Sequence, residues 1–369
     1  MKIGILTITP SIGFGGIMQA YALKYALEKL GHNVQVINYV PSRSIKSEIL
    51  YFLKGVVNLL RGKYTKFSFQ AELKYRSQNV IPFIEKYLNY SEKVTSNQQL
   101  KKLINSNYEA VIVGSDQVWR PQYVLGIENY YLEGVDSRIK RIAYAASFGV
   151  NIFEYTKEEA IRCSKLLKSF SYVSVREKSG VELVKTYLNY LGNVHCDLDP
   201  TLLVGTLAYE RFLSSPGQST GRIFSYILDP TVDRENLVKR ISNSLNLGVY
   251  SFNTNAENPK KGLEERVAPS VEEWLNGIYN AQFVVTDSFH GCVFSILFNK
   301  EFIVYVNKNR GAERFQSILS QLNLLDRMIY DEADFDSVIL TKSIVWNKIN
   351  IFFNAQRKDI VKRLMTVLD

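Results

Sequence analysis

His290 is the residue of this sequence best placed for acid–base chemistry. It follows an apolar run, Phe283 to Thr286, and precedes a second apolar run at helical spacing, Cys292 to Phe298. The pattern predicts a strand, a tight turn and a helix, with an imidazole in the turn. In α/β proteins ligands bind where a strand feeds the start of a helix, because free N–H groups and the helix dipole favour anions there. A histidine can transfer a proton near neutral pH, although a purely structural role remains open.

Two charged residues follow other predicted strands. Arg176 comes directly after the run Tyr172–Val175, and a guanidinium suits a carboxylate or phosphate through paired hydrogen bonds. A surface ion pair with Glu177 or another acid is the competing interpretation. Asp116 follows the strand-like run 108–113; it suits a general base or an acceptor for a sugar hydroxyl, and equally the N-cap of a helical turn.

The elements that must hold these residues form a series of strands and helices. Residues 2–40 predict a βαβ unit with a glycine-rich first loop, Gly13-Phe14-Gly15-Gly16. Such a loop can cradle a phosphate, or it can let the following helix pack closely. Further strands end in small or charged residues, among them Ser115 and Ser147. Because parallel strands end at one edge of a sheet, we expect these residues to share that edge.

A linker-like stretch at 214–221 separates this set of elements from a second one. Two capping boxes, Thr156 with Glu159 and Ser270 with Glu273, predict helix starts on either side of it. We expect an N-terminal Rossmann-like domain over 1–210, a C-terminal one over 211–345, and a last helix over 346–369 that crosses back to the first domain.

The bulk composition is that of a globular protein. The chain has 369 residues, 46% of them hydrophobic and 22% charged, and a net charge of +9 that favours anionic partners. Its basic residues are dispersed and no nucleic-acid-binding motif is present, so we expect no nucleic acid. Three cysteines without paired spacing, and an N-terminus without a signal segment, predict a cytoplasmic protein. No His, Cys and carboxylate residues have metal-ligand spacing, so we expect no metal.

Residues 45–66 differ from the rest in combining an apolar face with lysine and arginine. A basic amphipathic helix can lie on the inner face of a membrane as a peripheral contact. Packing of the helix on its own domain is the favoured interpretation, because the polar face is not densely basic.

Five motifs in fixed order make the sequence resemble the polysaccharide pyruvyl transferase family. The first is Gly15-Gly16-Ile17-Met18-Gln19-Ala20-Tyr21-Ala22-Leu23, which follows the N-terminal strand. The others are Gly114-Ser115-Asp116-Gln117-Val118-Trp119, Ala145-Ala146-Ser147-Phe148-Gly149, Ser174-Val175-Arg176-Glu177 followed by Asp199-Pro200-Thr201-Leu202-Leu203, and Thr286-Asp287-Ser288-Phe289-His290-Gly291. The resemblance covers residues 2 to 330.

The resemblance implies two Rossmann-like domains facing across a cleft, similar to GT-B glycosyltransferases. It implies transfer of the pyruvyl group of phosphoenolpyruvate, the co-substrate, onto a sugar of a capsule or exopolysaccharide or its precursor, with no further cofactor. His290 would be the acid–base group and Arg176 a ligand of the donor, with N–H groups of the turn around Ser288, Phe289 and Gly291 holding its other anionic group. Asp116, Ser115, Ser147, Gly15 and Gly16 would lie on the side of the acceptor, which is nucleotide-linked, lipid-linked or an oligosaccharide.

One departure from the family pattern concerns charge. Many members have arginine where this chain has Ser288, and that arginine binds phosphoenolpyruvate. Lys308, Arg310 or Arg314 would have to replace it, and Arg314 is the preferred substitute because a helix start there would face the cleft. The alternatives are a glycosyltransferase with a nucleotide-sugar donor and a non-catalytic sugar-binding relative. The oligomeric state is open.

Overall fold

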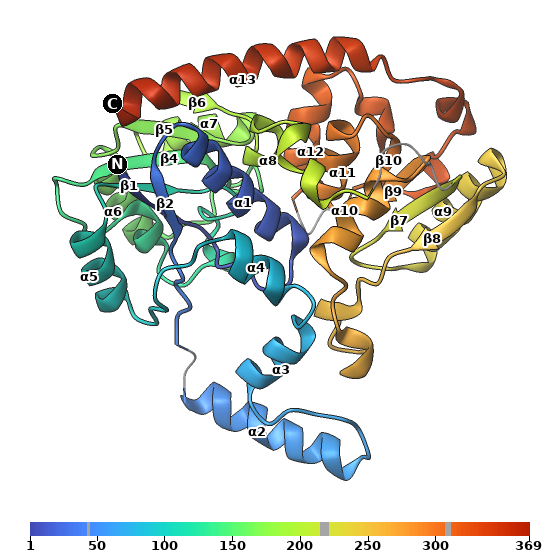
Figure 1. Ribbon diagram of the computed structural model, residues 1–369, viewed down its shortest axis with the longest axis horizontal. Helices are drawn as coiled ribbons and strands as arrows, with labels where there is room; N and C mark the ends of the chain where they lie inside the picture. The colour runs from blue at the N-terminus through green and yellow to red at the C-terminus, as the bar shows by residue number, and fades with distance from the viewer. Residues whose placement is uncertain (43–44, 215–220, 307–310) are drawn as a thin grey trace.

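The computed structural model of the protein describes residues 1–42, 45–214, 221–306 and 311–369. It contains two parallel β-sheets with helices packed around them (Figure 1), so the predicted α/β fold class is confirmed. The strands of the first sheet come from residues 2–196 and those of the second from residues 222–329. The boundary at 210–211 stays a prediction, and the two sets of strands fall on either side of it.

The first sheet has the strand order β2-β1-β3-β4-β5-β6, and all its pairs are parallel. Its strands are β1 (Lys2–Leu6), β2 (Asn33–Val36), β3 (Ala110–Val113), β4 (Lys140–Ala146), β5 (Tyr172–Val175) and β6 (Val194–Cys196). Its helices are α1 (Phe14–Lys29), α4 (Ile81–Tyr87), α5 (Asn97–Asn107), α6 (Lys157–Leu167), α7 (Lys178–Tyr187) and α8 (Pro200–Leu203). Because β2 and β3 flank β1 on opposite sides, the order reverses at β1, and such a point leaves a crevice for ligands.

The second sheet has the order β11-β10-β9-β7-β8 and is also parallel. Its strands are β7 (Arg222–Tyr226), β8 (Gly248–Ser251), β9 (Phe283–Thr286), β10 (Glu301–Tyr305) and β11 (Met328–Ile329). Its helices are α9 (Val232–Leu245), α10 (Val271–Tyr279), α11 (Phe289–Leu297) and α12 (Ala312–Gln321). The order reverses between β7 and β9, so this sheet also offers a crevice at its carboxyl edge.

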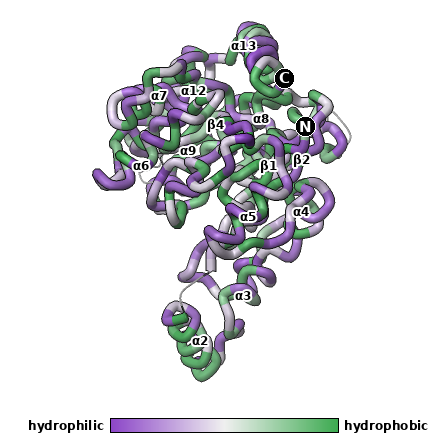
Figure 2. The backbone as a smooth tube through the Cα atoms, turned by 90° about the vertical axis from the view of Figure 1, so that its left-hand side faces the viewer, coloured by the Kyte–Doolittle hydropathy of each residue, from purple (hydrophilic) through white to green (hydrophobic). Residues whose placement is uncertain are grey.

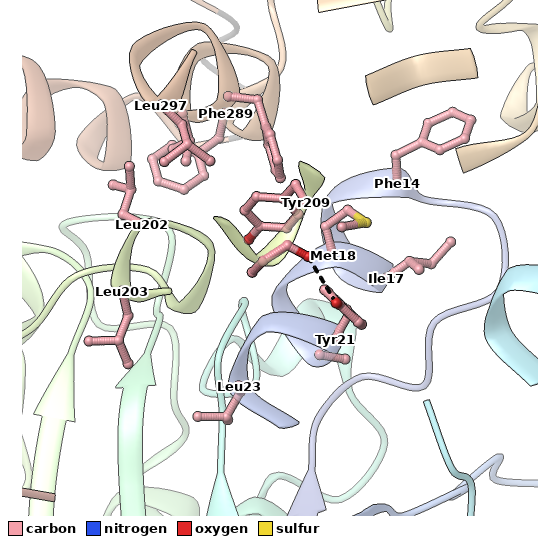
Figure 3. Close-up of a cluster of buried hydrophobic side chains, with 14 of the residues drawn as sticks. Phe14, Ile17, Met18, Tyr21, Leu23, Leu202, Leu203, Tyr209, Phe289 and Leu297 are labelled. Carbon is pink, nitrogen blue, oxygen red and sulfur yellow. Dashed lines mark hydrogen bonds between the residues drawn. The ribbon is translucent and has the colours of Figure 1, made fainter. Parts of the chain in front are cut away.

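One continuous apolar core joins the two sheets. The ring of Phe14, at the start of α1, stacks on Trp274 of α10 with ring centroids 5.5 Å apart. Tyr209 lies edge-on to Phe294 of α11, and Tyr21 donates a hydrogen bond to the carbonyl of Ala208 (Figure 3). The two sheets are therefore held together by buried apolar contacts.

The last helix, α13 (Trp346–Leu368), runs from the second half of the chain back along the first sheet (Figure 1). Ile360 and Leu364 are fully buried. Arg363 pairs with Asp197, just after β6, at 3.0 Å, and Nε of Arg357 donates to the carbonyl of Leu202 at 2.6 Å. The end of the chain thus completes the side of the first sheet.

Helices α2 (Ile45–Leu60) and α3 (Phe69–Arg76) form a hairpin that projects from the body of the molecule (Figures 1 and 2). Gly55 is the only residue of α2 that is buried. The favoured interpretation, in which α2 packs its apolar face on its own domain, is therefore wrong. The helix is held at its other side, against Phe67 and α3, which leaves the apolar face in solvent.

Candidate active site

A cavity of about 590 Å³ lies at the carboxyl ends of the strands of both sheets. One side is formed by the loop from Ile8 to Gly13, the start of α1, and Asp116, Gln117 and Tyr123. The other side is formed by Leu228–Pro230, loop residues between Asn253 and Lys260, the turn from Asp287 to His290, and Arg314. The cavity thus occupies the crevices where both strand orders reverse.

His290 lines this cavity from the first turn of α11. Its strand, β9, is fully buried, and Ser288 caps the helix by accepting a hydrogen bond from the Gly291 N–H at 3.3 Å. The Ser288 N–H donates to Thr286 Oγ1 at 3.0 Å. These two N–H groups are therefore used within the turn, and the serine serves as a helix cap.

The start of α1 approaches the imidazole very closely. A methyl group at Gly15 would lie 2.0 Å from Nδ1 of His290, whereas one at Gly13 would have no neighbour within 4 Å. A glycine at position 15 therefore lets the backbone of the first half of the chain contact the histidine of the second half.

This contact gives a test with a matched control. The Gly15→Ala substitution is expected to displace the imidazole and lower turnover by at least tenfold, because the added carbon overlaps the ring. The Gly13→Ala substitution is expected to leave turnover within about twofold of the original. Steady-state kinetics of the two variants checks this, and equal activities would contradict the close packing.

Asp199 is the centre of a buried group of charges. Its Oδ1 caps α8 by accepting from the N–H of Thr201 at 3.0 Å. Its Oδ2 lies 2.6 Å from Nη1 of Arg176 and 3.5 Å from Nε2 of His290. A carboxylate in this place can orient an imidazole and stabilise positive charge that develops on it.

Arg176 lies behind the cavity wall and contacts two carboxylates. Beside the bond to Asp199, its Nη2 lies 3.3 Å from Oδ1 of Asp116, and its side chain is 2% exposed. Nη1 of Arg314 reaches the same Asp116 oxygen at 3.9 Å. The two guanidinium groups lie against one ring, 4.7 and 5.0 Å from the centroid of Phe289. Of the two arginines, Arg314 is the one that lines the cavity.

The charges of the group shift one another's proton equilibria. Burial would raise the pKa of Asp199, but the close contact and charge of His290 and the charge of Arg176 hold it well below its usual range. Burial opposes a similar shift at Asp116, whose pKa is lowered by Arg176, His290 and Arg314. Burial and the nearby charge of Arg176 lower the pKa of Arg314 to about 10. Both carboxylates are therefore ionised at neutral pH, and Arg314 keeps its charge.

Ser115 and Ser147 lie close to this group without lining the cavity. Both side chains are fully buried. The Ser115 hydroxyl donates to the Ala145 carbonyl at 3.0 Å, and the Ser147 hydroxyl donates to Glu177 at 3.0 Å. They shape the strand ends, and direct contact with an acceptor stays a prediction.

Sequence reasoning missed the central position of Asp199 and the function of Asp287. Oxygens of Asp287 accept from the N–H groups of Leu228 at 2.6 Å and Asp229 at 3.1 Å, which joins the end of β9 to the end of β7. Burial raises the pKa of Asp287 against the effect of these bonds. The available signal was position, because Asp287 directly follows the apolar run 283–286 and Asp199 opens the Asp199-Pro200-Thr201 motif. Lys308 and Arg310 lie outside the described residues.

Two features are absent from the described part of the chain. No group of three or more His, Cys, Asp and Glu side chains there is arranged to hold a metal ion. Within the same residues, no helix has both the length and the apolar character needed to cross a membrane.

Comparison with known proteins gives a family match. The model of the family described as polysaccharide pyruvyl transferase matches residues 14–309. None of the curated protein sequences compared matches the chain.

Several solved structures resemble the chain at low identity. A putative UDP-N-acetylglucosamine 2-epimerase from Listeria monocytogenes is 11% identical, with 88% of each chain covered and a TM-score of 0.45. T4 phage BGT in complex with UDP and Mn²⁺ is 12% identical, with 100% of each chain covered and a TM-score of 0.42. E. coli heptosyltransferase WaaC with ADP is 12% identical, covers 89% of this chain and 100% of its own, and has a TM-score of 0.36.

Proposed function

This chain belongs to the polysaccharide pyruvyl transferase family, and from that membership we propose that it moves the pyruvyl group of phosphoenolpyruvate onto a sugar as a ketal, releasing phosphate. The observation that carries the proposal is the placement of His290 at the cavity wall, with Asp199 3.5 Å behind it and Arg314 on the same cavity. An acid and a cation then face one space, and a carboxylate behind the acid orients it.

The donor requires a cation because phosphoenolpyruvate carries a phosphate and a carboxylate. This chain has Ser288 where many family members have arginine. Arg314 takes over the role of that arginine, since it lines the cavity and keeps its charge. The start of α1 contributes a second attraction for anions, because the helix has no side-chain cap at Gly13 and its first N–H groups lie at the cavity. Arg176 then acts through Asp116 and Asp199, holding both carboxylates in place.

The reaction needs one proton at carbon and one leaving phosphate. His290 gives a proton to C3 of the enol, which becomes a methyl group, and a sugar hydroxyl adds to C2. The bond between C2 and the phosphate oxygen breaks, and a neighbouring hydroxyl closes the ketal at the same carbon. Of the two protons that the hydroxyls release, one replaces the proton that His290 gave to C3 and the other leaves with the phosphate. Asp116, ionised and 22% exposed, accepts a hydrogen bond from an acceptor hydroxyl. Positive groups placed where charge develops lower the barrier.

Binding of the donor can be tested without an acceptor. Saturating phosphoenolpyruvate is expected to raise the melting temperature by a few degrees, since binding to the folded state alone stabilises it by mass action. The Arg314→Ala variant is expected to lose this shift and to bind at least tenfold more weakly. Lys260→Ala, which removes another cation of the cavity wall, is expected to keep it.

Two outcomes would contradict the proposal. A shift with a nucleotide sugar, and none with phosphoenolpyruvate, would favour a glycosyltransferase. Binding of an acceptor sugar without phosphate release under any condition would favour a non-catalytic sugar-binding protein.

A further inference from the structure

The α2–α3 hairpin, residues 45–76, exposes an apolar face that the rest of the described chain does not cover. The large apolar side chains of α2 that are at least 44% exposed are Ile45, Ile49, Leu50, Phe52, Leu53, Val57, Leu59 and Leu60. In Figure 2 helix α2 lies at the end of the projecting arm, and much of its tube has the colour of hydrophobic residues. Soluble monomers rarely expose a continuous apolar patch of this kind, and such a patch marks a site of interaction.

The side of α2 opposite its apolar face contacts the rest of the hairpin. Gly55 allows close approach of Phe67, whose ring would lie 3.1 Å from an added methyl group. The Tyr51 hydroxyl donates to Glu72, and Glu72 also pairs with Arg266 at 3.0 Å. The apolar face therefore points outward because the other side of α2 is already occupied.

The charges around the face indicate what covers it. Residues 45–66 contain five basic side chains, Lys46, Lys54, Arg61, Lys63 and Lys66, and one acidic side chain, Glu48. A second copy of the chain would bring these like charges together. A stable protein interface also takes about 20–30 residues from each partner, more than this single helix face supplies. An apolar face with a basic border matches a bilayer of anionic lipid.

We propose that the hairpin docks the protein on an anionic lipid surface, with α2 lying in the plane of the interface. The apolar side chains enter the boundary between headgroups and acyl chains, and Lys54, Arg61 and Lys63 remain at the level of the lipid phosphates. Docking by such a helix is peripheral and does not span the bilayer.

The hairpin is also fixed to the cavity. Nη1 of Arg76, at the end of α3, donates to the carbonyl of Ala256 at 2.7 Å, and Asn79 donates to the carbonyl of Ala268 at 3.0 Å. Ala256 lines the cavity. A docked protein therefore holds the cavity wall at a set distance from the lipid surface.

Co-sedimentation of the full chain with vesicles tests the proposal. The protein is expected to bind vesicles of phosphatidylcholine with about a third phosphatidylglycerol at least tenfold more tightly than vesicles of phosphatidylcholine alone, with binding weakened by salt. The Leu50→Glu/Leu53→Glu variant is expected to lose at least tenfold in affinity. Replacing Lys54, Arg61 and Lys63 by glutamine is expected to lose at least tenfold for the anionic vesicles only.

A matched control separates the hairpin from exposed apolar residues in general. Ile161→Glu/Leu191→Glu changes two side chains that are also exposed and lie far from the hairpin in the sequence, and it is expected to bind as the original does. Equal melting temperatures exclude unfolding as the cause of lost binding. Absence of binding to either vesicle overturns the proposal. So does a dimer in solution that Leu50→Glu/Leu53→Glu dissociates, since a second copy would then cover the face. Phosphate release by the same variants in detergent is a separate readout of the transfer reaction.

Discussion

Replacing His290 by alanine is expected to lower the rate of phosphate release from phosphoenolpyruvate by roughly 10²–10⁴-fold in the presence of acceptor, the range for a positioned acid–base group. The imidazole lines the cavity, and Asp199 lies 3.5 Å from Nε2 to orient it. The measurement is a continuous assay of released phosphate.

His195→Ala is the control for this substitution. His195 lies on β6 and stacks on Tyr172 with ring centroids 5.1 Å apart, away from the cavity. The control is expected to keep near-normal turnover. If His290→Ala turns over as fast as His195→Ala does, His290 is not the acid.

The Asp199→Asn substitution is expected to affect both activity and stability. It removes the charge that faces Arg176 and His290 in a site where both side chains are buried, and breaking a buried pair costs about 3–5 kcal/mol. Urea unfolding measures the loss, and phosphate release is expected to fall with it because His290 loses its orienting carboxylate. Asp359→Asn, which removes the exposed partner of Arg363, is the control and is expected to change stability by less than about 0.5 kcal/mol.

The dependence on pH follows from the same contacts. The pKa of Asp199 is lower in the folded protein than the value of about 3.9 expected in the unfolded chain. The carboxylate therefore adds stability at neutral pH, and this contribution is lost as the pH falls below about 4. The difference in unfolding free energy between the original and Asp199→Asn should shrink over that range.

The local pattern of the sequence was enough to predict the elements that hold the site. Apolar runs that end in polar residues mark β3, β5 and β9, and both predicted capping boxes, at Thr156 and Ser270, are present. These features depend on neighbouring residues, so a single sequence contains the information.

The contacts across the molecule were harder to predict. The sequence places Asp199 only within a motif. In the structure one of its oxygens caps a short helix, and the other joins Arg176 and His290 from distant segments. The exposed face of α2 shows the same limit. Periodicity predicts an amphipathic helix, but which surface covers its apolar side depends on the tertiary structure. From the sequence, Ser288 was predicted only to lack the positive charge of the family arginine. Its role as the N-cap of α11 could be identified only from the geometry of the turn.

The return of α13 to the first sheet has a consequence for synthesis of the protein on the ribosome. The strands of that sheet are complete once β6 has been made, but Asp197 and the carbonyl of Leu202 receive their partners, Arg363 and Arg357, from the far end of the chain. At translation rates of about 5–20 residues per second, α13 is synthesised on the order of ten seconds or more after β6. During that interval the surface later covered by Ile360 and Leu364 is exposed to solvent. The nascent chain therefore most needs protection from aggregation in this interval.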